Sequence, residues 1–253
     1  MPRIMLTDTQ WDKLSAFMQH TGLIYHKTKY RQTLEGILYH MRTGIPWRDL
    51  PSEFGKGNSV FQHFNAWSKK GILHLIFNWL SGLSDTEWLF IDGSIVRVHQ
   101  HSAGAASEED EAMGQSRGGR STKIHLAVDS YGLPVHFELS GGQVNDIIHA
   151  ESLVSQSPLS DFVIADKGYD SQRLRSVIEE QKSVPVIPYR KNSRKLDQKI
   201  DKCLYRYRHL VENAFARIKH FHAIATRYDK LERNYASMLA LAFIIVWLPM
   251  WAE

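Results

Sequence analysis

Cysteine is almost absent from this 253-residue chain, which contains only Cys203. A single thiol cannot form a disulfide within the chain, and such low cysteine use is typical of proteins in the reducing cytoplasm. The stretch MPRIMLTDTQWDKL at the start of the sequence also lacks the apolar run of a secretory signal. We therefore expect a cytoplasmic protein.

Apolar runs long enough to cross a bilayer are also lacking. The most apolar stretch, residues 236–251, has 16 residues and contains Pro249, whereas a membrane-spanning helix needs about 20. We interpret it as a helix packed in the core, with a membrane span as the alternative. At 43% apolar and 23% charged residues the composition is that of an ordinary globular protein, and no membrane partner is expected.

The net charge is small, at +4, but it is unevenly distributed. Residues 167–233 contain 17 of the 31 lysines and arginines but 8 of the 27 acidic residues, so the rest of the chain is net acidic by 5. A basic segment of this kind is typical of proteins that bind polyanions. The alternative is a charged face that only contacts solvent.

Residues 1–85 are predicted to form a small all-α domain. Apolar residues recur at helical spacing in four stretches, the first of which begins near Thr7 or Asp8; they cover residues 6–18, 30–44, 59–71 and 72–82. A turn-rich connector and a helix with polar outer faces are also consistent with a helix-turn-helix that reads DNA. Many small helical domains share this pattern, so other roles stay open.

Residues 86–253 show strand periodicity alternating with helical periodicity. The apolar run at residues 88–100 predicts a central strand, and residues 101–121 a loop. The elements expected after it are a hairpin at 122–140, a helix at 147–156, a strand at 161–166, a helix at 171–182, a strand at 184–188 and a helix at 205–221. A hairpin beside crossover units predicts an α/β fold, with a mixed sheet flanked by helices.

Three acidic residues in this second region have unusual positions. Asp92 lies inside an apolar strand, where a lone carboxylate is costly unless it is paired or binds a cation. Asp166 ends another buried strand, and ligands of α/β sheets bind at such carboxyl ends. Glu212 lies along the edge of the apolar face of the helix at 205–221. Three oxygen donors without His or Cys favour Mg²⁺ or Mn²⁺, and two such ions would suit displacement at a phosphodiester.

Each of these acids also has a simpler interpretation. Asp166 could only form a turn, and Glu212 could only pair with Arg208 one helical turn away. Asp92 is the hardest to explain in this way. Local roles in turns and at helix or strand starts account for Asp129, Asp146 and Asp161, and zinc binding at His99 and His101 is disfavoured because no third ligand is near.

The helix at 205–221 also aligns Tyr205, Arg208, Glu212 and Lys219 in one stripe, since their spacings of three, four and seven residues nearly match whole turns. In this arrangement Glu212 would hold metal while the other three meet phosphate oxygens.

This spacing and several other motifs resemble one family. The segments FIDGSIVRVHQHSAGA, GRSTKIHLAVDSYGLPV, ADKGYDS and HLVENAFARIKHFHAIATRYDKL are similar to those of bacterial insertion-sequence DDE transposases with a Tyr-Arg-Glu-Lys signature, in the insertion sequence four/five superfamily and of the insertion-sequence-five type. The resemblance implies a ribonuclease H-like catalytic domain at residues 86–253. It implies that Asp92, Asp166 and Glu212 bind the metal, and that Tyr205, Arg208 and Lys219 contact DNA. Further backbone contacts are expected from Arg190, Lys191, Arg194, Lys195 and Arg217.

The function that follows is DNA transposition. We expect the helical region to bind the terminal inverted repeats of the element, and the metal site to cut each end and transfer it to target DNA. Because two ends must be joined, a homodimer or larger assembly on DNA, associated with the bacterial nucleoid, is expected. The alternatives are a catalytically inactive, transposase-derived DNA-binding regulator and a plain metal-dependent nuclease.

Overall fold

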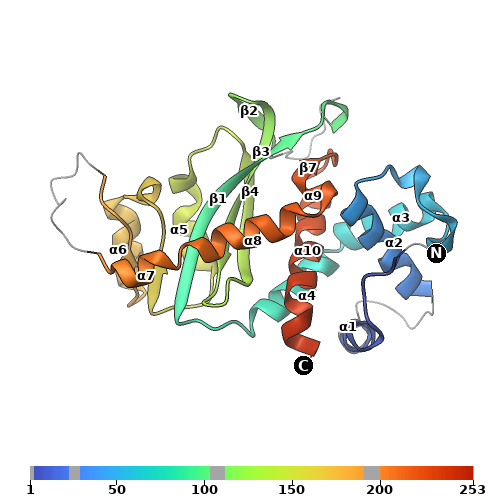
Figure 1. The fold of residues 1–253 in the computed structure, drawn as a ribbon, viewed down its shortest axis with the longest axis horizontal. Helices are drawn as coiled ribbons and strands as arrows, with labels where there is room; N and C mark the ends of the chain where they lie inside the picture. Colours follow the sequence, from blue (N-terminus) through green and yellow to red (C-terminus); the bar gives the residue numbers. More distant parts are fainter. Residues whose placement is uncertain (1–2, 23–28, 103–111, 191–199, 253) are drawn as a thin grey trace.

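A computed structural model describes residues 3–22, 29–102, 112–190 and 200–252 of the chain. A mixed sheet lies at the centre with helices on both faces, and the amino-terminal helices lie to one side of it (Figure 1).

The amino-terminal region is helical, as predicted. It contains α1 (Asp8–His20), α2 (Lys29–Thr43), α3 (Gly57–Lys69) and α4 (Ile72–Ser81), with the short 3-10 helices η1 (Trp47–Asp49) and η2 (Ser52–Phe54) between α2 and α3. Thr7 caps α1 through a capping box, because its hydroxyl accepts from the Gln10 amide while the Gln10 side chain accepts from the Thr7 amide.

Among the described residues the sheet has seven strands: β1 (Trp88–Val98), β2 (Gly114–Ser116), β3 (Gly119–Val128), β4 (Pro134–Gly141), β5 (Phe162–Ile164), β6 (Val184–Val186) and β7 (Thr226–Arg227). β3 pairs antiparallel with β1 and β4, whereas β5 runs parallel to both β1 and β6. Three antiparallel strands followed by two parallel ones give the ribonuclease H-like fold, so the predicted fold class is confirmed.

The loop predicted at residues 101–121 is wrong in part. Beyond the short 3-10 helix η3 (Gln100–Ser102), β2 pairs with the start of β3 around a turn at Ser116–Gly119. Gly119 adopts φ 98°, a conformation that favours glycine. β2 consists of only three residues, Gly, Gln and Ser, and has no alternation of apolar and polar residues, so sequence periodicity could not predict it.

The helices of the second region are α5 (Asp146–Gln156), the 3-10 helix η4 (Lys167–Tyr169), α6 (Gln172–Glu180), α7 (Lys202–Arg206), α8 (His209–Lys219), α9 (His222–Ala225) and α10 (Glu232–Ala252). The single helix expected at 205–221 is therefore wrong. α7 ends in hydrogen bonds of the 3-10 type, in which the Tyr207 amide donates to the Leu204 carbonyl and the Arg208 amide to the Tyr205 carbonyl. α8 then begins at His209.

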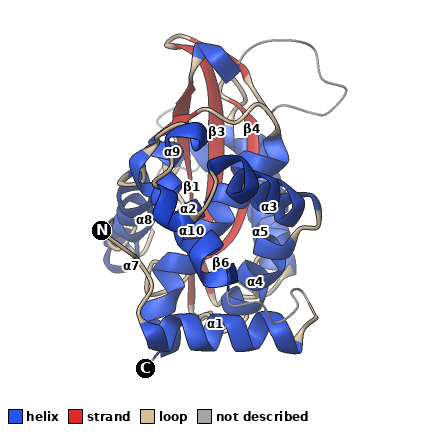
Figure 2. Ribbon diagram, turned by 90° about the vertical axis from the view of Figure 1, so that its right-hand side faces the viewer, coloured by secondary structure: helices blue, strands red, loops and turns tan. Residues whose placement is uncertain are grey.

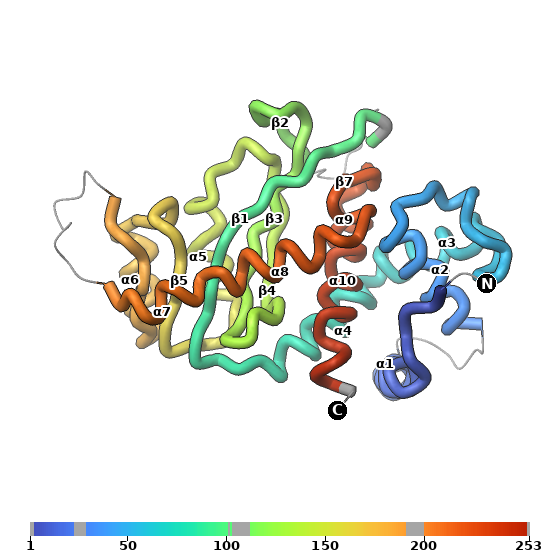
Figure 3. Tube along the Cα trace, in the orientation of Figure 1, coloured from blue at the N-terminus to red at the C-terminus, as the bar shows by residue number. Residues whose placement is uncertain are grey.

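α10 lies between the sheet and the amino-terminal helices (Figures 2 and 3). It is the described helix that is long and apolar enough to span a membrane, over Glu232–Trp251, but 67% of its apolar window is buried inside the molecule. Phe243 lies 5.3 Å from the Phe77 ring of α4 and 5.2 Å from the Phe137 ring of β4, centre to centre. α10 is thus a core helix, as predicted, and buried residues from Leu6 to Leu248 form one cluster. The boundary between residues 85 and 86 stays a prediction.

Candidate active site

The candidate site lies at one edge of β1, between its two parallel partners. β5 pairs with β1 only at residues 88–90, and β7 only at residues 97–98. Within the described ranges, no strand pairs with this edge at residues 91–96. Asp92 lies in that interval, and α8 crosses the sheet in front of β1 (Figure 1).

The Asp92 carboxylate is held from two sides. Its Oδ1 accepts from the Gly93 amide at 2.8 Å, and its Oδ2 lies 3.2 Å from Nη1 of Arg208. Burial raises the pKa of Asp92, and the charges of Asp166 and Asp146 raise it further, while the Gly93 bond and Arg208 lower it. A nearby cation would stabilise the ionised form of a carboxylate in this environment.

Arg208 joins two of the three predicted catalytic acids. Nη1 of its guanidinium binds Asp92 on β1, and Nη2 binds the exposed carboxylate of Glu212 on α8. Burial disfavours the Arg208 charge, but the charges of Glu212 and Asp92 outweigh it and raise its pKa. The simple pairing of Glu212 with Arg208 is therefore present, but the same guanidinium also brings Glu212 to Asp92.

Asp166 follows β5, in line with Asp92 on β1. It caps η4, since its Oδ1 accepts from the Gly168 amide at 2.6 Å. Arg190 covers this loop, with Nη2 donating to the Gly168 carbonyl at 2.8 Å and Nε to the Lys167 carbonyl at 3.3 Å. Asp166 and Arg190 line one surface pocket of about 390 Å³.

The other predicted DNA contacts lie mostly near this edge. Nζ of Lys219, at the end of α8, donates to the Ser94 hydroxyl at 2.6 Å, and burial lowers its pKa. Tyr205 lies near enough to Arg208 to influence its pKa, and Arg217 is exposed on α8. Lys191, Arg194 and Lys195 lie outside the described residues.

Asp146 lies at the start of a helix, as predicted, but its approach to β1 was not predicted. It does not cap α5, because Asn145 occupies the capping position and Asp146 is the first helical residue. Its Oδ1 lies 3.1 Å from Nζ of Lys123, and a β-carbon on Gly93 would lie 2.2 Å from that oxygen. Glycine inside a strand can indicate such a close approach, so Gly93 was the available signal.

Tyr169 is buried near three acidic residues. Its side chain is 1% exposed, and its hydroxyl makes no hydrogen bond within the described structure. Burial raises its pKa, and the charges of Asp146, Asp92 and Asp166 raise it further. Three carboxylates thus act on one buried hydroxyl.

The donor chemistry fits a hard divalent cation. Asp92, Asp166 and Glu212 offer oxygen donors only. Burial, with a smaller contribution from the charge of Asp166, raises the pKa of Asp92, so a bound cation would favour its ionised form. In the part of the chain that the structure describes, no three acidic, cysteine or histidine side chains are already gathered as a metal site. The Arg208 guanidinium lies between two of the three acids, Asp92 and Glu212, and offsets part of their negative charge.

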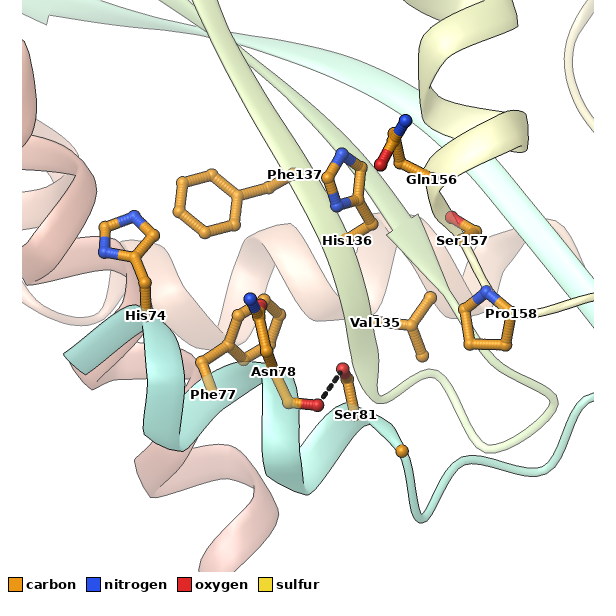
Figure 4. A pocket seen from close by; sticks show the side chains of 11 residues that line it. His74, Phe77, Asn78, Ser81, Val135, His136, Phe137, Gln156, Ser157 and Pro158 are labelled. Carbon is orange, nitrogen blue, oxygen red and sulfur yellow. Dashed lines mark hydrogen bonds between the residues drawn. The ribbon is translucent and has the colours of Figure 1, made fainter. Parts of the chain in front are cut away.

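A separate cavity lies away from these residues. It has a volume of about 500 Å³ and lies between α4 and β4 (Figure 4). His74, Phe77, Val135 and Phe137 line it, and the Ser81 hydroxyl at its rim donates to the Asn78 carbonyl at 2.9 Å. None of the predicted site residues lies in this cavity.

Two family models match the chain, one for each region. Residues 6–77 match the family described as "Putative transposase of IS4/5 family", and residues 84–247 match "Transposase DDE domain". The chain belongs to the IS4/5 family of DDE transposases. The resemblance found in its motifs is thereby confirmed at the level of the family.

Individual relatives agree with this assignment. A Brucella ovis protein named "Putative transposase for insertion sequence element IS6501" is 32% identical over 131 residues, which cover 50% of this chain and 98% of that protein. A Burkholderia cepacia protein named for insertion sequence element IS402 is 26% identical over 136 residues, covering 49% of this chain and 62% of that protein.

Solved transposase structures are more distant. A Mos1 transposase paired-end complex with the left transposon end gives a TM-score of 0.27 at 12% identity, covering 88% of this chain and 75% of that one. A piggyBac transposase synaptic complex with hairpin DNA gives a TM-score of 0.31 at 16% identity, and the match covers 44% of this chain and 25% of that one.

Proposed function

We propose that the chain binds the terminal inverted repeats of its own insertion sequence, cuts a phosphodiester at each end, and joins the freed 3′-hydroxyl to target DNA. The observation that carries the proposal is the Arg208 guanidinium, which bonds Asp92 from β1 and Glu212 from α8. Residues 120 positions apart in the sequence therefore meet at the open edge of β1, beside the strand that Asp166 follows.

Asp92, Asp166 and Glu212 would hold Mg²⁺ or Mn²⁺, with two ions expected. Bound divalent ions lower the pKa of an attacking water or hydroxyl and stabilise the leaving oxygen. Since hydrolysis and strand transfer need the same arrangement of charges around one phosphate, a single site can serve both reactions.

The cationic side chains position the DNA. Arg208 is the group that would exchange its carboxylates for a phosphate when metal binds, because guanidinium binds both with similar geometry. Lys219 lies further along β1, beside Ser94, and Tyr205 lies next to Arg208. Arg190 covers the loop after Asp166. These residues would hold the strand on both sides of the cut.

Recognition of the ends is assigned to the helices before β1, and a dimer or larger assembly would hold two ends together. Two other functions use the same residues differently. A plain nuclease would cut without joining, and a catalytically inactive regulator would bind without cutting. The presence of all three acids favours an active enzyme over the regulator.

The test is a cleavage assay on labelled DNA that carries the element's own ends, in Mg²⁺, Mn²⁺ or EDTA. A metal-dependent nick at the element boundary, followed by a product joined to target DNA, is expected. Cutting without any joined product would favour the nuclease, and specific binding without cutting in every metal would favour the regulator.

Glu212→Gln is the matched variant, because it removes one charge and keeps the size of the side chain. It should bind the ends and leave them uncut. Substantial residual cleavage would refute the role of Glu212 in metal binding.

A further inference from the structure

The loop that follows β5 is held by charged side chains that the proposed chemistry does not use. β5 pairs with β6 as far as Ile164 and Val186, so Asp166 lies two residues beyond the paired strands. The motif ADKGYDS covers this loop, and it contains a second acidic residue, Asp170. The proposed cleavage gives Asp170 no role.

The Asp170 carboxylate has a different donor on each oxygen. Nη2 of Arg175, on α6, lies 3.0 Å from Oδ1, and the amide of Arg190 donates to Oδ2 at 2.8 Å. The same Nη2 donates to the Ile187 carbonyl at 2.8 Å. The side chains of Asp170 and Arg175 are only 12% and 6% exposed. Removing such a pair from water costs free energy that apolar packing would not, but the pair fixes the loop, α6 and the chain after β6 relative to one another.

Arg190 extends this constraint to Asp166. Its Nη2 donates to the Gly168 carbonyl at 2.8 Å, and its Nε donates to the Lys167 carbonyl at 3.3 Å. The Lys167 carbonyl belongs to the same peptide group as the Gly168 amide, which donates to Oδ1 of Asp166 at 2.6 Å. The carboxylate of Asp170 thus holds the backbone of Arg190, and the guanidinium of Arg190 holds the peptide that binds Asp166.

We propose that Asp170 is a positioning residue for the metal site, which acts through Arg175 and Arg190 to fix the loop that presents Asp166. Asp170 itself would contact neither the metal nor DNA. This inference rests on the proposed function, because the position of Asp166 matters to the reaction only if Asp166 binds metal.

Asp170→Asn is the test variant, because asparagine has nearly the same size but one acceptor oxygen. It can accept from Arg175 or from Arg190, and its own N–H groups would face the other donor. Binding of Mn²⁺ to the protein alone, measured from the paramagnetic resonance signal of free Mn²⁺, should weaken by about 10- to 100-fold, the usual cost of losing a group that orients a metal ligand. Binding to the element end should keep its salt slope, because no phosphate contact is lost.

Hydrogen exchange separates positioning from a general loss of stability. In metal-free Asp170→Asn, the amides of residues 166–170 should exchange faster, while those of β1 keep their protection. If Asp170 were only a stabilising residue, the variant would melt at a lower temperature but would bind Mn²⁺ normally well below that temperature. Unchanged Mn²⁺ affinity would therefore overturn the inference.

Glu151→Gln is the matched control, because it makes the same chemical change at a more exposed ion pair between α5 and α6. The side chains of Glu151 and its partner Arg173 are 31% and 82% exposed, and this variant should bind Mn²⁺ like the unmodified protein. Arg175→Lys keeps a positive charge beside Asp170 and should retain most of the affinity, whereas Arg175→Met should lose it. Equal affinities in the two Arg175 variants would contradict a role for the ion pair.

Asp166→Asn distinguishes failure of this inference from failure of the proposed function. If Asp166→Asn loses Mn²⁺ binding while Asp170→Asn keeps it, only the positioning role is refuted. If Asp166→Asn binds Mn²⁺ like the unmodified protein, the metal site itself is wrongly assigned, and the inference fails with it.

Discussion

Oδ1 of Asp146 lies 2.2 Å from the position that a β-carbon on Gly93 would occupy. The carboxylate at the start of α5 thus presses against the backbone of β1 one residue after Asp92. Adjacent residues of a strand point to opposite faces, so Asp146 supports from one face the segment that presents Asp92 on the other.

Gly93→Ala should therefore destabilise the protein. The added methyl group overlaps with Asp146, and relieving an overpacked contact typically costs about 1–3 kcal/mol in the free energy of unfolding. Thermal unfolding should show a lower melting temperature, by roughly 2–4 °C for each kcal/mol. Gly118→Ala is the control, because among the described residues its methyl group would meet only the Ser116 hydroxyl oxygen, at an ordinary contact distance of 4.0 Å. Equal melting temperatures for the two variants would contradict the close approach.

His40 should make stability depend on pH below neutrality. Burial lowers its pKa to about 4, and its ring stacks on Trp47 while Nδ1 lies 2.7 Å from the Ile45 carbonyl. The unfolded chain binds this proton more readily, so stability falls as the pH drops from the unfolded value of 6.5 towards 4. The loss between pH 7.5 and pH 5 should be about 2 kcal/mol.

Denaturant unfolding at several pH values measures this contribution, with His40→Gln as the comparison. Other titrating groups are shared by the two proteins and cancel in the difference. Parallel stability curves would show that His40 does not carry this pH dependence.

Lys219→Ala should weaken DNA binding and reduce its salt dependence. Nζ of Lys219 is held at the edge of β1 by the Ser94 hydroxyl, and the loss of one phosphate contact lowers the salt slope by about 0.9. Ser94→Ala keeps the charge and removes only the hydroxyl, so it should retain the slope. A slope unchanged in Lys219→Ala would remove this lysine from the phosphate contacts.

Phe243→Ala should destabilise both regions of the chain together. Its ring packs between Phe77 of the helical region and Phe137 of the sheet, and truncation of a buried Phe typically costs about 3–5 kcal/mol. Tryptophan fluorescence, circular dichroism and calorimetry should report one common shift. A second transition that keeps its original midpoint would indicate that residues 1–85 unfold on their own.

The three acids proposed to bind metal could be found in the sequence because each interrupts a local pattern. Asp92 interrupts an apolar strand, Asp166 ends one, and Glu212 lies at the edge of an amphipathic helix. Such patterns depend on neighbours within one element, and they gave the order of strands and helices correctly from β1 to β6, except for the short β2.

Features that depend on distant residues could not be found in this way. The close approach of Asp146 to Gly93 depends on the packing of α5 on β1. Arg208 lies at the junction of α7 and α8 and reaches Asp92, although the helical pattern runs through this junction without interruption. In both cases the contact joins residues that are far apart in the sequence, so local periodicity could not predict it.

The position of α10 has a consequence for the spacing between the DNA sequence that the protein would recognise and the bond that it would cut. Lys13 of α1 donates to the Trp251 carbonyl at 2.8 Å, and the Ser237 hydroxyl of α10 donates to Ser68 of α3 at 2.9 Å, so the last helix is attached to the first ones. The same helix packs on α4 and β4 through Phe243. If the amino-terminal helices read the repeat as proposed, they cannot swing freely relative to Asp92. The rigid connection between the two regions would then fix the number of base pairs between the recognised sequence and the cut.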